Sequence, residues 1–253
     1  MTSTRMRKPG REAYTLLDKS FFYGLGEVSR KLLAHGVKHA LYGGVGLQAH
    51  FSRRLAGQNS MDATPSLVQY LRPTGDYDLA VEADLTREKL FGALGKLDGS
   101  VEEFSDGFYS TRVVRFGEKR TQVEVTRLSN DGDEDVNVQV TFYNEEERHQ
   151  NMVREAQPVR LIYAPLEIEI PCAPLEATVA GKLSRAGIKR DIVDVINVLE
   201  LFPETDLDAV GKILTEIGRK QPHVYGMRSR VSEGRDKFLQ YLRQLKEASD
   251  KQS

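Results

Sequence analysis

Residues 72–82 read Arg-Pro-Thr-Gly-Asp-Tyr-Asp-Leu-Ala-Val-Glu, and this stretch governs the fold prediction. Polar and apolar residues alternate in it from Asp76 onward, and the apolar ones share one face: Tyr77, Leu79 and Val81. Successive side chains of a β-strand point to opposite faces, so residues 76–82 are predicted to form a half-buried strand. Asp76 and Asp78 would then project together from its polar face.

Further elements are predicted on both sides of this strand. A glycine pair, Gly43-Gly44, separates a short apolar strand pattern from a helical one. The predicted helices are residues 12–33, 45–51, 65–71 and 86–97, and the other predicted strands are residues 39–42, 108–116, 121–128 and 136–142. This order indicates a mixed β-sheet with helices packed on it, in the α+β or α/β class.

The second part of the chain is predicted to be helical. Helical patterns follow three prolines, at residues 175–186, 190–201, 207–218 and 231–248. We therefore expect a boundary near residue 165, between a sheet domain over residues 1–165 and a C-terminal helical domain over residues 166–253. In the first of these, the polar connection over residues 52–75 is long enough to indicate a functional loop.

The composition describes a globular chain of nearly balanced charge. Its 253 residues include 36 Lys and Arg, 37 Asp and Glu, and 40% hydrophobic residues. This supplies a sizeable core, and the balanced charge argues against a generic polyanion binder. Because Cys172 is the single cysteine, neither an internal disulfide nor the usual thiolate zinc site is expected. No apolar run suits a membrane span or a signal peptide, so a cytoplasmic protein is expected.

The paired acids suggest divalent-metal chemistry. Carboxylates two residues apart on a strand point the same way, and such hard oxygen ligands suit Mg²⁺ together with substrate phosphates. Two ions held in this way activate an attacking hydroxyl and stabilise a pyrophosphate leaving group. Glu124 leaves the apolar face of its own predicted strand, so it could join Asp76 and Asp78 if the two strands are neighbours. A lone Asp-x-Asp pair is more often only a solvated strand face.

The glycine pair adds a second indication. Gly43 and Gly44 let the backbone approach a ligand closely, and the N-terminus of the helix behind them offers unpaired N–H groups to a phosphate. Taken alone, such a pair is more often a tight turn. Together with the acids, it supplies what nucleotide transfer to a hydroxyl needs.

This combination resembles the nucleotidyltransferase superfamily, in which a glycine motif at the start of a helix precedes an Asp-x-Asp strand and a later acid. The matching positions here are Gly43, Gly44, Asp76, Asp78 and Glu124. Residues 175–194 are further similar to the lysine helix and Lys-Asp-x-x-Asp element of AbiEii-type nucleotidyltransferase toxins, and they contribute Lys182, Asp191 and Asp194.

The resemblance implies a nucleotidyltransferase-like fold and a Mg²⁺- or Mn²⁺-dependent transfer of a nucleoside monophosphate from an NTP. It also implies a toxin of a toxin–antitoxin or abortive-infection pair, with the 3′ end of tRNA as RNA acceptor and a cognate antitoxin protein as partner. Asp76, Asp78 and Glu124 would hold metal. Lys182 would neutralise the triphosphate, Asp191 would assist it, and the nucleotide would contact Arg72, Thr74, Asp194, Gly43 and Gly44.

Several alternatives stay open at this stage. The stem of Lys182 could instead cover apolar surface, and Asp191 and Asp194 could simply stabilise the start of their helix. Val45 stands where the superfamily often has Ser or Thr, so a catalytically silent member that binds nucleotide or RNA is possible. The acceptor could also be a small molecule, such as an aminoglycoside, or a protein. Residues 218–253 carry nine Lys and Arg against four Asp and Glu, which favours RNA.

Overall fold

The structure is a computed structural model of the chain. It describes residues 15–55, 65–95, 98–104, 107–115, 120–128, 136–143, 147–163, 166–185, 189–218 and 222–251. Its helices are α1 (Lys19–Ala34), α2 (Gly43–Leu55), α3 (Pro65–Val68), α4 (Arg87–Leu94), α5 (Glu147–Arg154), α6 (Leu175–Leu183), α7 (Lys189–Leu201), α8 (Leu207–Gly218), α9 (Pro222–Val231) and α10 (Arg235–Asp250). Its strands are β1 (His39–Tyr42), β2 (Asp76–Val81), β3 (Asp98–Phe104), β4 (Gly107–Arg115), β5 (Arg120–Leu128), β6 (Val136–Tyr143), β7 (Gln157–Tyr163) and β8 (Leu166–Cys172).

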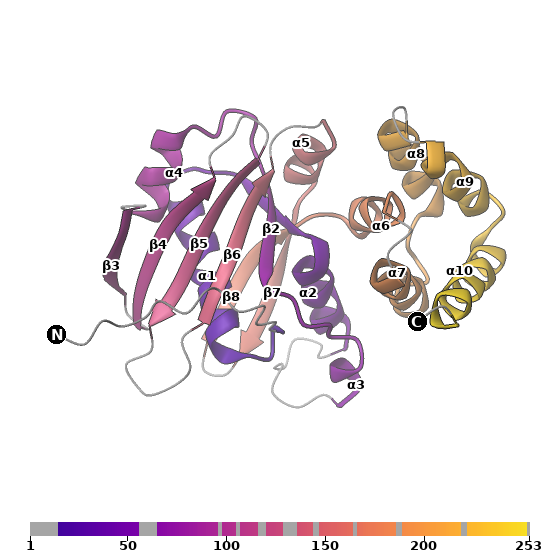
Figure 1. The fold of residues 1–253 in the computed structure, drawn as a ribbon, viewed down its shortest axis with the longest axis horizontal. Coiled ribbons are helices and arrows are strands. Elements are labelled where there is room, and N and C mark those ends of the chain that lie inside the picture. The colour runs from indigo at the N-terminus through magenta and orange to yellow at the C-terminus, as the bar shows by residue number, and fades with distance from the viewer. Residues whose placement is uncertain are drawn as a thin grey trace.

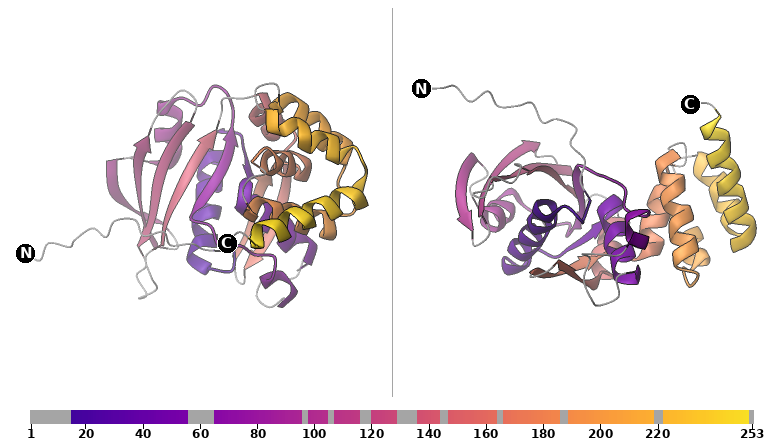
Figure 2. Two further views of the ribbon diagram at one scale, coloured as in Figure 1. Left: turned by 45° about the vertical axis from the view of Figure 1, so that its right-hand side comes forward. Right: turned by 90° about the horizontal axis from the view of Figure 1, so that it is seen from below.

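The described strands form one eight-stranded mixed sheet, in the order β3-β4-β5-β6-β2-β1-β8-β7. The β2–β6 and β1–β8 pairs are parallel, and the other pairs are antiparallel. Helices α1 and α4 lie on one side of the sheet, and α6 to α10 gather beyond α2, which packs against α6 and α7 (Figure 1). Seen from below, the sheet curves around α1 (Figure 2). The predicted fold class, a mixed sheet with flanking helices followed by helices, is confirmed.

A first core fills the space between α1 and the apolar face of the sheet. The apolar face of β2 lies in it, as the alternation predicted: Tyr77, Leu79 and Val81 are all buried. The Tyr77 ring packs against Phe21 of α1, with the two centroids 4.6 Å apart, and its hydroxyl donates to the Phe21 carbonyl oxygen. This anchor fixes the rotation of β2, so the two aspartates face away from the core.

A second core joins the sheet to the C-terminal helices. Helix α2 contributes to both cores, because Val45 and Ala49 face the first while Leu47 and Phe51 face the second. The second core is completed by apolar residues of α6 to α10, among them Val179, Val195, Leu199, Val210, Phe238 and Leu242. Helix α2 therefore joins the sheet to the helical part, aided by a small cluster in which Ala40 and Ala80 of the sheet meet Ala177 of α6. The space beside the N-terminus of α2 lies at this junction.

The sequence patterns located the central elements and missed several peripheral ones. Strands were predicted at β1, β2, β4, β5 and β6, and they are present. No element was predicted for β3, α5, β7, β8 or α9, whose sequences carry charged residues or prolines within the element. The boundary predicted at residue 165 falls between β7 and β8, and the sheet continues to Cys172 because β8 pairs with β1 there. The division into two domains stays a prediction.

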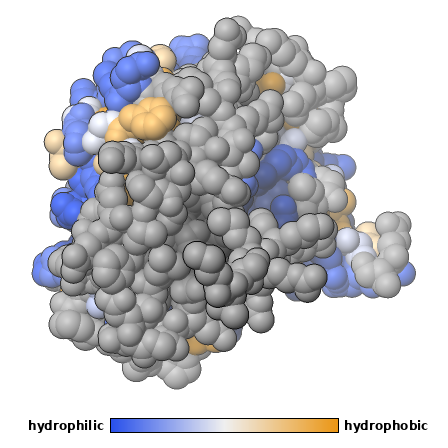
Figure 3. All heavy atoms as spheres, turned by 60° about the vertical axis from the view of Figure 1, so that its left-hand side comes forward, coloured by the Kyte–Doolittle hydropathy of each residue, from blue (hydrophilic) through white to orange (hydrophobic). Residues whose placement is uncertain are grey.

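Within the described residues, no helix has the length and apolar character that crossing a membrane requires. The described surface in the view of Figure 3 is mainly hydrophilic, and hydrophilic side chains also line a hollow right of centre.

Two equally buried histidines differ in their hydrogen bonds, so they can be compared directly by mutation. His39 is 2% exposed; its Nε2 lies 2.8 Å from the Ser29 Oγ, and its Nδ1 lies 3.2 Å from the Val37 carbonyl oxygen. His149 is also 2% exposed, but neither ring nitrogen has a partner among the described residues. Burial and the nearby Arg148 lower the pKa of His149 to about 4, so its ring is neutral.

We expect His39→Leu to lower the free energy of unfolding by about 2 kcal/mol, because it leaves the Ser29 hydroxyl without its partner. His149→Leu should leave that free energy unchanged or raise it, because it breaks no such hydrogen bond. Urea unfolding of the two variants beside the wild type measures the difference. Equal losses in both variants would contradict the expectation.

Candidate functional site

The two aspartates of β2 lie on the polar face of the sheet with hydrogen-bond donors beside them. The Thr74 hydroxyl donates to Asp76 Oδ1 at 2.6 Å, and Tyr143 of β6 donates a hydrogen bond to Asp78. Asp76 and Asp78 both line a cavity of about 370 Å³. Its wall is formed by Gly44, Arg72, Pro73, Thr74, Gly75, Asp76, Asp78, Gln139, Lys182, Arg185, Arg190 and Asp191.

The glycine pair brings the start of α2 against the acids. Helix α2 begins directly after β1, and Gly43 turns the chain with φ at +68°. A Cβ at this position would overlap the Asp78 carboxylate, so glycine is required both by the backbone angle and by the close approach. Gly44 lines the cavity, where the first N–H groups of α2 are available to an anion.

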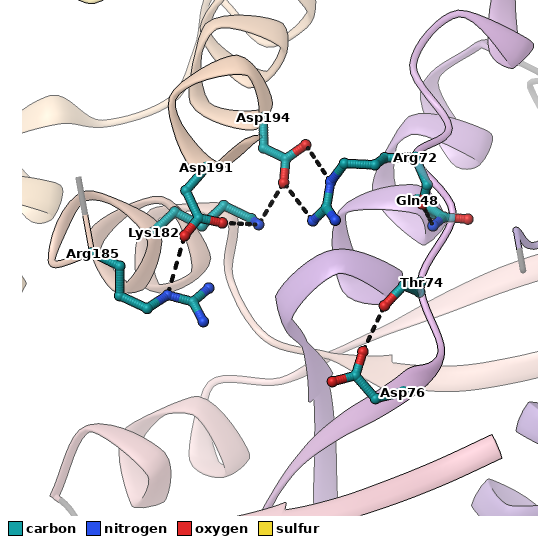
Figure 4. A network of polar contacts seen from close by, with 8 residues as sticks. All are labelled: Gln48, Arg72, Thr74, Asp76, Lys182, Arg185, Asp191 and Asp194. Atoms are coloured by element: carbon teal, nitrogen blue, oxygen red, sulfur yellow. Dashed lines mark hydrogen bonds and ion pairs between the residues drawn. The ribbon is translucent and has the colours of Figure 1, made fainter. Parts of the chain in front are cut away.

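Four charged side chains of the opposite wall form one hydrogen-bonded network (Figure 4). Lys182 Nζ donates to Asp191 Oδ1 at 3.2 Å and to Asp194 Oδ2 at 2.6 Å. The Arg72 guanidinium donates to both oxygens of Asp194, at 3.3 and 2.9 Å. The network thus ties the loop before β2 to helices α6 and α7.

Burial makes this network costly to break. The side chains of Lys182 and Asp191 are only 2% and 1% exposed, whereas Arg72 and Arg185, which pairs with Asp191 at 3.3 Å, reach the surface. Removing one member of a buried ion pair typically costs about 3–5 kcal/mol, because the partner charge stays desolvated. Lys182 is therefore held by two carboxylates, and its charge reaches the cavity from a fixed position and not as a mobile side chain.

The predicted positions outside the acid pair divide into two groups. Arg72, Thr74, Lys182, Asp191 and the glycine pair line the cavity or adjoin it, and Asp194 binds two of its cations. Val45, by contrast, points into the first core, so a hydroxyl there would not reach the cavity.

The third acid predicted from the sequence does not adjoin Asp76. The strand next to β2 is β6, whose Gln139 pairs with Asp76, and Glu124 of β5 pairs with Gln139 on the far side. Glu124 thus lies two strand spacings, about 10 Å, from Asp76 along the backbone. Its side chain falls outside the described part of the chain, and its role in metal binding stays a prediction.

Four residues of the site were not predicted from the sequence: Gln139, Tyr143, Arg185 and Arg190. Gln139 and Tyr143 could not be found before the strand order was known. Arg185 and Arg190 flank the Lys-Asp-x-x-Asp element, and their charge was the available signal. Arg190 is exposed, lines the cavity and forms no ion pair within the described residues.

The electrostatics of Asp78 fit a cation-binding role. Burial, with a further contribution from the adjacent Asp76, raises the pKa of Asp78 to about 7, although Arg185, Lys182 and Tyr143 oppose the shift. A divalent cation between the two carboxylates would offset this repulsion, and Mg²⁺ takes one or two carboxylates alongside substrate phosphates. The described residues contain no group of three or more His, Cys, Asp or Glu that could hold a metal. The fit therefore depends on two acids and a phosphate-bearing substrate.

Some basic residues of the last helices are engaged in contacts within the helical part. Salt bridges join Arg230 to Glu233, Arg243 to Glu200 and Lys189 to Asp250. Arg235 donates to the carbonyl oxygens of Leu199, Phe202 and Thr205. These contacts give three of the nine basic residues of 218–253, Arg230, Arg235 and Arg243, a structural role within the helical part.

Comparison with known proteins gives similarity of overall shape only. No protein-family model and no curated protein matches the chain. The solved structure of JHP933 from Helicobacter pylori is similar over 93% of this chain and 95% of its own, with 11% identity and a TM-score of 0.46. A second H. pylori structure, described as that of a candidate nucleotidyltransferase, covers 92% of this chain and 96% of its own, with 12% identity and a TM-score of 0.45. At these TM-scores the likeness decides neither family nor activity, and the case for a function comes from the site.

The contact between Gly43 and Asp78 predicts the effect of adding one methyl group. Gly43→Ala should lower the melting temperature and abolish any Mg²⁺-induced rise in it, because either α2 or the Asp78 carboxylate must move. Gly181→Ala on α6 is the matched control: a Cβ there meets nothing within 4 Å, and alanine favours a helix by up to about 1 kcal/mol. Thermal unfolding with and without Mg²⁺ tests both variants, and a wild-type Mg²⁺ response in Gly43→Ala would contradict the assignment.

The raised pKa of Asp78 predicts a carboxylate that destabilises the metal-free fold. The pKa of Asp78 is 3.8 when the side chain is unperturbed, as in the unfolded chain, and about 7 in the folded protein. The free energy of unfolding therefore falls as the pH rises between these two values. Asp78→Asn should therefore raise the free energy of unfolding at pH 8 without metal, by up to about 4 kcal/mol, and raise it much less at pH 4. Urea titrations at both pH values measure the difference.

Asp84→Asn serves as the control with the opposite sign. A hydrogen bond from Lys89 lowers the pKa of the exposed Asp84, so its removal should slightly decrease stability at pH 8. If Asp78→Asn also decreased stability at pH 8, Asp78 would be a structural acid.

Proposed function

We propose that this protein is a nucleotidyltransferase that moves a nucleoside monophosphate from an NTP to an acceptor hydroxyl. The observation that carries the proposal is the Gly43 turn, which places the N-terminus of α2 directly against Asp78 in the same cavity as Lys182. Anion-binding N–H groups, paired carboxylates and fixed cations then face one space. A triphosphate bound to a divalent cation needs this combination.

The side chains divide the work by charge. In the reaction, a bond forms between the acceptor oxygen and the α-phosphorus, the bond from that phosphorus to the bridging oxygen breaks, and pyrophosphate leaves with the electron pair. The hydroxyl proton passes to solvent. Asp76 and Asp78 would hold Mg²⁺ or Mn²⁺, which supplies charge neutralisation at the transferred phosphate. Gly43 and Gly44 would seat the phosphates against α2.

The cations would stabilise the leaving pyrophosphate. Lys182 is fixed by Asp191 and Asp194, so it needs no reorganisation as negative charge develops, and such preorganised charge is worth several kcal/mol of transition-state stabilisation. Arg190 has no competing partner within the described residues and is free to bind a phosphate.

A finer assignment comes from the resemblance of residues 175–194 to AbiEii-type toxins. On this resemblance we propose that the protein is a cytoplasmic toxin of a toxin–antitoxin or abortive-infection pair. It would modify the 3′ end of tRNA and be neutralised by an antitoxin protein. Growth arrest on expression, relieved by a co-expressed neighbouring gene, would support this assignment.

Incubation of the protein with each α-labelled NTP, Mg²⁺ and total RNA tests the reaction directly. We expect label transfer and pyrophosphate release, and loss of both in an Asp76→Asn, Asp78→Asn double variant. Arg190→Gln should raise the KM for the NTP about tenfold, whereas Arg228→Gln on α9, outside the cavity wall, should not change it. Label transfer by the double variant at the wild-type level would contradict the proposal.

A further inference from the structure

The two sides of the acid pair differ in charge. The side formed by the loop before β2 and by α6 and α7 carries four cations: Arg72, Lys182, Arg185 and Arg190. The side formed by β6 and β5 presents uncharged polar groups wherever its side chains are described: Gln122, Gln139, Thr141 and Tyr143. A triphosphate is attracted to the first side, which leaves the second for the other substrate.

The strand register places two of these neutral groups next to the acids and a third one strand further away. Gln139 is the β6 partner of Asp76, and Thr141 is the β6 partner of Asp78. Gln122 of β5 follows in the same row as Thr141, so all of them share the face from which the acids project. Helix α1 packs on the opposite face of these strands (Figure 1), and Gln139 itself lines the cavity.

The side-chain amides of Gln122 and Gln139 have donors and acceptors that no described residue uses. Gln122 Nε2 donates to Gln139 Oε1 at 3.3 Å and to Thr141 Oγ1 at 3.4 Å, both long for such bonds. Both glutamines are half-buried, and the Gln139 amide donors and the Gln122 amide oxygen have no partner within the described residues. An amide offers a donor and an acceptor side by side, which suits the vicinal hydroxyls of a sugar.

We propose that Gln122 and Gln139, with the buried hydroxyl of Thr141 accepting from Gln122 behind them, form the acceptor subsite and that it selects an uncharged, hydroxyl-rich group, a sugar ring, over a cationic acceptor. This inference rests on the proposed function and names its second substrate. A cationic aminosugar would find no counter-charge among the described side chains of β5 and β6, whereas the amides lose paired hydrogen bonds if the hydroxyls are absent. A free sugar and the terminal ribose of an RNA both present such vicinal hydroxyls, so either is a source of this group.

Equilibrium binding in the presence of Mg²⁺ and a saturating non-hydrolysable NTP tests the subsite. The probes are a fluorescent oligoribonucleotide with a free 3′ ribose, its 2′,3′-dideoxy counterpart, a neutral trisaccharide and a cationic aminoglycoside. We expect the ribose end or the trisaccharide to bind at least tenfold more tightly than the dideoxy end and the aminoglycoside, and the stronger of the two identifies the source of the sugar. Preference for the aminoglycoside, or binding of no probe, would overturn the proposal.

Nearly isosteric variants assign the effect to the amides. Gln139→Met and Thr141→Val should each weaken binding of the preferred probe at least tenfold and leave the affinity for Mg²⁺-NTP unchanged, whereas Gln240→Met on the exposed face of α10 should change neither. If Mg²⁺-NTP binds but these variants keep wild-type probe affinity, the subsite is wrong and the proposed function stands. If Mg²⁺-NTP does not bind to the wild type, the proposed function itself fails. The affinity of Glu124→Gln for the aminoglycoside is a further control. If the Glu124 carboxylate governed acceptor choice, this variant would bind the aminoglycoside more weakly than the wild type.

Discussion

The ion-pair network around Lys182 is the constraint on which the site depends. A lysine that is 2% exposed between two aspartates is tolerated only because each charge has a partner, and those partners come from α7 and from the loop before β2. Arg72 closes the network from the sheet side, and its own carbonyl oxygen accepts a hydrogen bond from Gln48 of α2. The relative position of three separate segments is thereby fixed by electrostatics as well as by packing.

Helix α2 complements this network. Its two apolar faces lie in different cores, so it cannot rotate or slide without exposing side chains in both. Its N-terminus is thus held against Asp78 while its side chains join the sheet to the helical part. The same helix thus lines the cavity and packs into both cores, so the geometry of the cavity and the stability of the fold depend on shared residues.

Sequence reasoning located the acids, the glycine turn and the lysine helix because each has a strong local pattern. The alternation at Tyr77, Leu79 and Val81 is a property of one strand, and the structure confirms it without reference to any other element. The order of the strands is not such a property. That β6 and not β5 adjoins β2 depends on long-range pairing, so the position of Gln139 beside Asp76 and the greater distance of Glu124 could not be read from the chain. Strands β7 and β8 were missed because Pro158 and Pro171 signal breaks, although they occupy paired positions near one end of a hairpin at the edge of the sheet.

The strand order also bears on how the protein is made. Strand β2 is flanked by β1 and by the much later β6, β1 is completed by β8, and the network needs Asp194 on α7. A ribosome-bound chain that ends before α7 has its paired acids and Lys182, but it lacks Asp191 and Asp194, the two carboxylates that hold Lys182 in place. Such long-range pairing slows folding and postpones the last native contacts until most of the chain has been synthesised. The cavity is therefore completed late, because the buried lysine gains its two carboxylate partners only after α7 has been synthesised.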